Sequence, residues 1–373
     1  MSDRILVATR KGLFTFERKG PAAKPWTITH TDFFGDNVSM VLHDARHGHI
    51  HAALDHGHFG VKMHRADEAT RVWEELPAPA YPPKPEGLEE NDMWGRPLPW
   101  STVRIWALET GGSDEPGTLW CGTIPGGLFK SDDSGATWRI VESLWHHPDR
   151  PKWMGGGADL PGLHAIEVDP RNSAIVRVGV STGGMWQTDD GGASWRVRGK
   201  GLRAEYTPPE QAHDPISQDV HALAQCAGEP DRLWIQHHNG IFHSEDGGET
   251  WREIEDVGVS TFGFAVKVHP KDGKTAWFVP AIKDEKRVPE GGRFVVTRTQ
   301  DGGRTFETLS RGLPAEHAYD LVYRHALDID GTGRRLAMGS TTGGVWVSED
   351  GGESWIEAAG RLPPVYCVRF MAS

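Results

Sequence analysis

Imidazole, guanidinium and phenol side chains recur at one place in a repeated apolar pattern of this chain. Neutral imidazoles that converge from several segments can bind Zn, Mn or Fe and leave a position for a water, which the metal acidifies. Three of the recurring residues therefore predict a divalent metal site for hydrolytic chemistry: His164, His221 and His325. The full set, aligned on Leu163-His164-Ala165-Ile166, is Ser39, Arg104, His164, His221, Phe264, His325 and Tyr366.

The same side chains could also act without a metal. His164, His221 and Asp219 are candidate acid, base or orienting groups, and Tyr366 is a candidate hydrogen-bond donor. The candidate contacts for a substrate are Arg104, His237, Trp153 and Tyr206, with Arg104 as an anion clamp. A structural interpretation competes with these roles, because a histidine on an inner strand can simply bond a backbone carbonyl. Adjacent strand residues point to opposite faces, so at most one of His237 and His238 should reach a common centre.

The elements that must position these residues follow from an eight-residue phrase, Ser/Thr-x-Asp-x-Gly-x-Ser/Thr-aromatic. Its central acids are Asp133, Asp190, Asp246, Asp301 and Asp350, which are 57, 56, 55 and 49 residues apart. This spacing is typical of a four-stranded propeller blade that carries a loop insertion. Within the phrase, Asp accepts bonds from nearby backbone N–H groups and Gly accepts positive φ, so each copy predicts a turn.

Counting the repeats predicts an all-β fold, a seven-bladed β-propeller of four-stranded antiparallel blades in one domain, 1–373. Six blades are expected at 38–76, 103–142, 163–198, 220–255, 263–309 and 322–358. A lone apolar strand at 365–370 lacks partners, while three strands within 5–31 lack an opening strand. Joining them gives a seventh blade that closes the ring and leaves no sheet edge exposed.

The repeated phrase resembles the Asp-box, or BNR repeat, of sialidase-like propellers, photosystem II assembly factors and related bacterial proteins described as glycosyl hydrolases. The resemblance implies that the turns lie on the face opposite an active site. It departs from true sialidases, because Arg104-Ile105 is followed by Trp106 instead of proline, and no glutamate is visibly paired with Tyr366. Sialidase activity is therefore not expected.

The expected site face carries long connections at 82–101, 144–162, 201–219 and 283–293. Loops of this length without regular structure are often functional, and we expect them to wall a pocket at the channel mouth. Another glycosidase would need two carboxylates beside the scissile bond. Asp159, Asp214 and Asp219 are candidates, and Trp94, Trp100, Trp145 and Trp153 could stack on sugar rings.

Composition limits the partners of the protein. Lys and Arg total 40 against 52 Asp and Glu, and the net charge of −12 lacks the basic stripe that nucleic-acid binding needs. An apolar signal core and a membrane-length apolar run are both missing, and three cysteines without metal-like spacing fit a reduced compartment. We therefore expect a cytoplasmic protein without nucleic-acid or membrane partners.

Together these features predict a propeller that binds a small polar molecule at the channel mouth and hydrolyses it. The substrate would be a glycoside or another polar molecule, with assistance from a metal. The alternative is a non-catalytic assembly scaffold with a protein partner, like the photosystem II assembly factors. Clustered titratable residues on one face favour the enzyme, whereas a broad apolar or single-sign patch would favour the scaffold.

Overall fold

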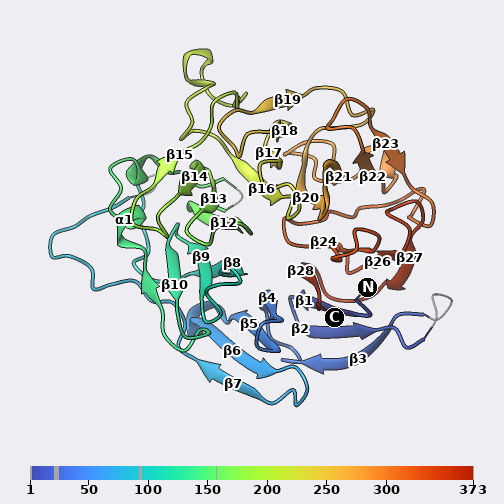
Figure 1. Cartoon of the computed structure of the whole chain (residues 1–373), viewed down its shortest axis with the longest axis horizontal. Coiled ribbons are helices and arrows are strands. Elements are labelled where there is room, and N and C mark those ends of the chain that lie inside the picture. Colours follow the sequence, from blue (N-terminus) through green and yellow to red (C-terminus); the bar gives the residue numbers. More distant parts are fainter. Residues whose placement is uncertain (1, 21–24, 92–94, 157, 373) are drawn as a thin grey trace.

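The computed structural model describes residues 2–20, 25–91, 95–156 and 158–372. Its strands form seven four-stranded antiparallel sheets, which are arranged as blades around a central axis (Figure 1). The prediction of a seven-bladed propeller is confirmed. Each blade is a meander whose first strand lies nearest the axis, so consecutive strands pair through short local connections.

The first three blades cover the first half of the chain. Blade 1 contains β4 (Val38–Asp44), β5 (His49–Asp55), β6 (Val61–Asp67) and β7 (Trp73–Leu76). Blade 2 contains β8 (Arg104–Thr110), β9 (Leu119–Ile124), β10 (Leu128–Ser131) and β11 (Arg139–Ile140), and the short helix α1 (Glu142–Trp145) follows it. Blade 3 contains β12 (Gly162–Val168), β13 (Val176–Ser181), β14 (Gly184–Thr188) and β15 (Arg196–Val197).

The next three blades complete the sequential part of the ring. Blade 4 contains β16 (Val220–Gln225), β17 (Leu233–His237), β18 (Ile241–Ser244) and β19 (Arg252–Ile254). Blade 5 contains β20 (Gly263–His269), β21 (Asp272–Pro280), β22 (Val296–Thr299) and β23 (Glu307–Leu309). Blade 6 contains β24 (Leu327–Ile329), β25 (Leu336–Gly339), β26 (Val345–Ser348) and β27 (Ile356–Ala359). None of the described helices is long and apolar enough to cross a membrane.

Blade 7 is built from both ends of the described chain. The order is β28 (Val365–Phe370), β1 (Arg4–Thr9), β2 (Gly12–Glu17) and β3 (Thr27–Asp32). β28 runs antiparallel to β1, with Ile5 opposite Phe370 and Val7 opposite Val368, which brings the N and C labels together in Figure 1. The predicted closure by terminal strands is confirmed, and it pairs the edge that β1 would otherwise expose.

A β-bulge recurs near the start of the inner strands. The register with the second strand skips Ser39, Trp106, His164 and His221 in blades 1 to 4, Phe264 with Ala265 in blade 5, and Tyr366 in blade 7. A bulge re-aims the side chain of the extra residue. In blade 2 the bulged residue is Trp106, so Arg104 lies two positions away from the place that the sequence alignment gave it.

Several bulged side chains bond the next blade. Ser39 Oγ donates to the Ile105 carbonyl at 3.3 Å, and His164 Nε2 donates to the Val220 carbonyl at 2.5 Å. His221 Nδ1 donates to the Gly263 carbonyl at 2.7 Å. Each acceptor directly precedes the bulged residue of the following blade, so the bonds link neighbouring inner strands at the channel mouth.

The five repeated phrases form the same turn between the third and fourth strands. In one copy, Asp246 accepts bonds from Thr250 N at 2.9 Å, Thr250 Oγ1 at 2.6 Å and Ser244 Oγ at 2.8 Å, while Ser244 Oγ accepts from Gly248 N at 2.9 Å. Asp133, Asp190, Asp301 and Asp350 have equivalent partners. Because connections alternate between the two faces in a meander, these turns lie opposite the start of the inner strands.

We expect Asp246→Ala to lower the free energy of unfolding by about 1–3 kcal/mol, because three hydrogen bonds at the turn are lost. Trp251, which closes the same phrase and is 5% exposed, should cost more when changed to Ala, about 3–5 kcal/mol, because a cavity is left. Urea unfolding of both variants measures these values. An Asp246→Ala protein of unchanged stability would contradict the structural role of the turn.

A buried histidine makes the stability of blade 4 depend on pH. His243 is 2% exposed and stacks on Trp234 at 4.1 Å, and burial lowers its pKa to about 4. Between about pH 6.5 and 4, the unfolded chain therefore binds a proton at this imidazole and the folded chain does not. The free energy of unfolding falls by about 1.4 kcal/mol for each unit by which the pH is lowered. Other buried histidines, such as His51 and His237, add to the same pH dependence, so we expect His243→Phe to reduce the slope in urea unfolding by about 1.4 kcal/mol per pH unit across the window. His30→Phe, at an exposed imidazole on β3, is the matched control and should leave the slope unchanged.

Candidate functional site

Two adjoining cavities lie where the inner strands begin, on the face opposite the repeated turns. The first, of about 220 Å³, is lined by Ser39, Arg104, Trp106, Phe264, Arg287, Tyr323, Arg324, His325 and Tyr366. The second, of about 330 Å³, is lined by Met154, Gly155, Gly156, Thr182, Tyr206, Asp219, His221, His238, Phe264, Asp284 and Arg287. Phe264 and Arg287 belong to both walls, so the two cavities are neighbours.

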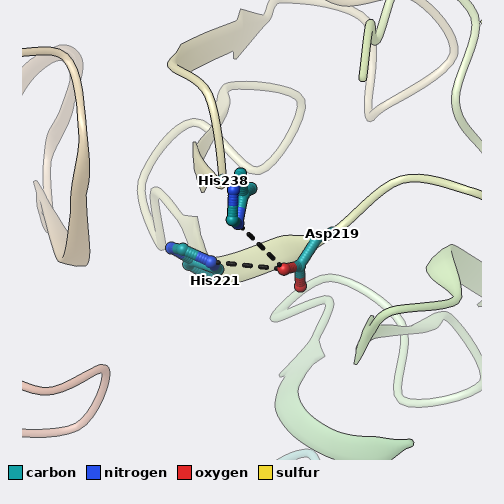
Figure 2. A group of neighbouring side chains, drawn as sticks. All are labelled: Asp219, His221 and His238. Atoms are coloured by element: carbon teal, nitrogen blue, oxygen red, sulfur yellow. Dashed lines mark ion pairs between the residues drawn. The ribbon is translucent and has the colours of Figure 1, made fainter. Parts of the chain in front are cut away.

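A carboxylate faces two imidazoles in the second cavity (Figure 2). Asp219 directly precedes β16, His221 is the bulged residue of that strand, and His238 directly follows β17. Asp219 Oδ2 lies 3.4 Å from His221 Nε2 and 3.3 Å from His238 Nδ1. The other oxygen, Oδ1, accepts a bond from Ser181 Oγ at 2.7 Å, which fixes the carboxylate plane.

Burial and charge set the protonation of this group. Burial alone would raise the pKa of Asp219, but the charges and hydrogen bonds of His221 and His238 hold it well below its usual range. Burial lowers the pKa of His221, although Asp219 partly offsets the effect. Burial also opposes the charged form of His238, yet its bond to Asp219 raises the pKa of this imidazole.

The tautomer of His221 leaves a lone pair directed at the carboxylate. Its Nδ1 donates to the Gly263 carbonyl, so in the neutral ring Nε2 carries no proton and faces Asp219 Oδ2 at 3.4 Å. A proton on Nε2 or a metal ion between the two atoms would make this contact attractive. Among the described residues, Asp219, His221 and His238 are the one group of three whose ligand atoms lie within 4.8 Å of one another.

The structure does not bring His164 and His325 into this group. His164 is fully buried, with Nε2 bonded to the Val220 carbonyl and its ring against Trp106 at 5.3 Å. His325 lines the first cavity, and its buried Nε2 has no hydrogen-bond partner among the described residues. The structure therefore does not gather His164, His221 and His325 as expected, because the bulge commits His164 to the next blade.

The predicted polar contacts divide between the two cavities. Arg104 lines the first and forms an ion pair with Asp55 Oδ2, at 3.0 Å from Nε and 2.9 Å from Nη2. Tyr366 also lines it, and burial raises the pKa of its phenol. Tyr206 lines the second cavity, where its ring lies 5.0 Å from that of His238 and its hydroxyl donates to the Ser217 carbonyl at 2.7 Å.

Two other predicted contacts lie outside both cavities. His237 is fully buried with its ring 5.3 Å from Phe242, and its neighbour His238 is the member of the pair that reaches the site. Trp153 is 6% exposed, contacts Trp186 at 5.7 Å and lines a separate pocket of about 460 Å³. Their side chains therefore stabilise the blades around the site and do not line it.

The carboxylates that line the second cavity differ from those expected for a glycosidase. Asp284 lines the second cavity with Asp219 but is bound by Arg287. The side chain of Asp159 is 82% exposed, and Asp214 caps a local turn through its bond from Ile216 N at 3.0 Å. Trp94, a candidate for sugar stacking, lies outside the described residues.

Arg324 and Arg287 were not among the site residues predicted from the sequence, although Arg324 stands at the edge of the aligned ring and Arg287 within the insertion 283–293. Arg324 lies between aromatic rings, with its guanidinium carbon 4.8 Å from the centre of Trp106 and 5.1 Å from that of Phe264. The available signal was its place beside His325 in an opening strand. Arg287 comes from the insertion between β21 and β22, where the unusual loop length was the signal.

Comparisons with known proteins agree with this architecture. No protein-family model matches the chain. A xyloglucanase of Hypocrea jecorina (strain QM6a) is 27% identical over 236 residues, which cover 62% of this chain and 22% of the relative. The chain thus spans about a fifth of that enzyme. An oligoxyloglucan-reducing end-specific xyloglucanase of Emericella nidulans is 37% identical over 80 residues, which cover 21% of this chain and 9% of that relative.

Two kinds of solved propeller are similar over most of the chain. The GH74 xyloglucanase from Xanthomonas campestris has a TM-score of 0.63 at 15% identity, covering 97% of this chain and 53% of the enzyme. YCF48 from Cyanidioschyzon merolae has a TM-score of 0.52 at 13% identity, covering 86% of this chain and 84% of that protein. At these identities the likeness establishes the fold alone: this chain is a seven-bladed propeller that resembles both GH74 xyloglucanases and YCF48.

Proposed function

We propose that this protein is a hydrolase that binds a small polar molecule at the channel mouth and activates water with Asp219, His221 and His238. The observation that carries the proposal is the carboxylate held 3.3–3.4 Å from two imidazole nitrogens at the wall of a cavity of about 330 Å³. The partial similarity to a xyloglucanase supports hydrolysis and makes a glycosidic bond the first substrate class to test. A single domain over 1–373 and a cytoplasmic location remain predictions.

We infer that the group binds a divalent Zn, Mn or Fe ion through Asp219 Oδ2, His221 Nε2 and His238 Nδ1. Two imidazoles and one carboxylate are a donor set that such ions accept, and the lone pair of His221 is already directed at the shared centre. Ser181 orients the carboxylate, as the hydrogen-bonding partners of metal ligands commonly do. When bound, the ion would polarise a water and lower its pKa toward neutrality.

The residues of this chain would then bind and orient the substrate. The water gives one proton to solvent as its oxygen forms the new bond to the electrophilic atom of the substrate; the bond to the leaving group breaks, and the leaving group takes up a proton from solvent. Arg324 lies close enough to Asp219 to lower its pKa, so it can also stabilise negative charge that develops between the cavities. Tyr206 covers His238 on the outer side of the second cavity.

A protein-binding scaffold is the second candidate, and three exposed aromatic residues favour it. Phe34, Phe59 and Tyr319 are 88%, 73% and 68% exposed. They lie in connections between β3 and β4, β5 and β6, and β23 and β24, which belong to the cavity face. Exposed aromatic side chains suit peptide binding, and a similar solved structure is that of YCF48 bound to D1 peptide, with a TM-score of 0.50.

Metal analysis of protein purified without a histidine tag tests the leading proposal. We expect stoichiometric Zn, Mn or Fe in the wild type and more than roughly 100-fold weaker binding in Asp219→Asn, His221→Ala and His238→Ala, since ligand loss should exceed the loss caused by supporting residues. His58→Ala removes an exposed imidazole on the same face and should bind normally.

Activity is measured on chromogenic glycosides, esters and phosphomonoesters with the same variants. Loss of hydrolysis together with metal in the three variants, but not in His58→Ala, is the expected result. Hydrolysis that persists in all three folded variants would exclude this group as the active site. The scaffold is the better description if two results are found together. No substrate is turned over, and a peptide that the wild type captures is not captured by the double variant Phe34→Ser with Phe59→Ser.

A further inference from the structure

The first cavity holds a buried cation that no carboxylate of the described residues contacts directly; Asp219, the charge that most favours its charged form, is joined to it only through the Ser181 hydroxyl. Arg324 is 7% exposed, and among the residues that the structure describes no carboxylate forms an ion pair with it. Its Nε is buried without a hydrogen-bond partner, and Nη2 donates only a long bond of 3.3 Å to Ser181 Oγ. Burial lowers its pKa to about 10, so the guanidinium remains charged at neutral pH. Buried charges are costly unless they are paired.

The other two arginines of the wall are neutralised, which makes Arg324 exceptional. Arg104 contacts Asp55 Oδ2 at 2.9 Å, and Arg287 contacts Asp284 Oδ1 at 2.5 Å. Arg324 therefore differs from Arg104 and Arg287 in lacking a direct contact with any described carboxylate, although Asp219 and Asp284 are near enough to favour its charged form.

Aromatic rings fix the direction of the Arg324 guanidinium. Trp106 and Phe264 lie 4.8 and 5.1 Å from its central carbon, and such contacts hold a guanidinium by its faces. The N–H groups at the edge are then left to bond a ligand. A planar, bidentate fork of this kind matches the oxygens of a carboxylate or a phosphate better than it matches a neutral group.

Further donors line the same cavity. The rings of Tyr323 and Tyr366 lie 6.0 Å apart, and neither hydroxyl has a hydrogen-bond partner among the described residues. His325 presents a buried Nε2 that is also without a partner. The cavity of about 220 Å³ has room for an anionic group, and its shared wall with the second cavity leads toward Asp219.

We propose that Arg324 is the anchor of an anion-binding subsite that takes the carboxylate or phosphate group of a small molecule. Tyr323 and Tyr366 donate to the same group. This inference rests on the proposed hydrolase and names its substrate class. The substrate is a small anionic molecule that reaches past Phe264, so that its scissile bond lies at Asp219, His221 and His238. The binding of the anion itself does not depend on hydrolysis.

Calorimetry and thermal unfolding of metal-stripped protein test the subsite. Inorganic phosphate and acetate should bind and raise the melting temperature, whereas neutral acetamide should do neither. Metal is removed so that an anion cannot bind by ligating it. The preference between phosphate and acetate then separates a phosphorylated ligand from a carboxylate ligand.

Arg324→Met should weaken binding of the preferred anion at least roughly 30-fold. It should also leave the ligand-free protein as stable as the wild type or more stable, because an unpaired buried charge is removed. Arg139→Met, at an exposed arginine on the turn face, is the matched control and should change neither property. If Arg324→Met does not fold, Arg324→Lys keeps the charge without the fork and should still lose most of the affinity.

Three results would overturn the inference. They are equal effects of acetate and acetamide on the wild type, anion binding that survives in folded Arg324→Met or Arg324→Lys, and a destabilised ligand-free Arg324→Met that binds anion normally. His238→Ala separates the two proposals, because it removes a proposed metal ligand and should keep the anion-induced stabilisation. Failure of the metal group thus leaves the subsite standing, and failure of the subsite leaves the metal measurement intact.

Discussion

The hydrogen bond from a bulged inner-strand residue to the next blade decides how the channel mouth is built. The blades contact their neighbours mainly through buried apolar side chains, whose packing is not directional. The bonds from Ser39, His164 and His221 to carbonyls of the following strand fix neighbouring inner strands to each other at one height. Because an imidazole has two nitrogens, this structural bond can use one of them and leave the other for chemistry.

His164 and His221 illustrate the two outcomes. Both use one ring nitrogen on the following blade, but the second nitrogen of His164 is buried without a partner while that of His221 faces Asp219. The difference comes from the residue two positions before the histidine, which is an aspartate in blade 4 and Gly162 in blade 3. The same hydrogen bond to the next blade is thus purely structural in blade 3, whereas in blade 4 it also fixes the tautomer of a candidate ligand.

Much of the architecture could be predicted from the sequence, because repeated turn phrases and alternating strands are local signals. Closure by β28 followed from counting strands without partners. The ring of mouth residues was harder to align. Five of the six bulged positions agree with the alignment. In blade 2 the alignment placed Arg104 where the bulged residue is Trp106. A shift of two residues preserves the alternation of a strand, so the sequence pattern does not reveal it. Which of His237 and His238 faces the site depends on where β17 ends, and Arg287 reaches the cavity from an insertion that has no repeat to guide it.

The composite seventh blade connects the wall of the first cavity to the closure of the ring. Tyr366 belongs to β28, which the ribosome makes after every other strand described here, and it forms part of the wall around Arg324. The groups that contact Arg324 directly, Trp106, Ser181 and Phe264, belong to blades 2, 3 and 5. The last-made strand therefore adds only the Tyr366 side of the wall, and the cavity is complete only when β28 pairs with β1.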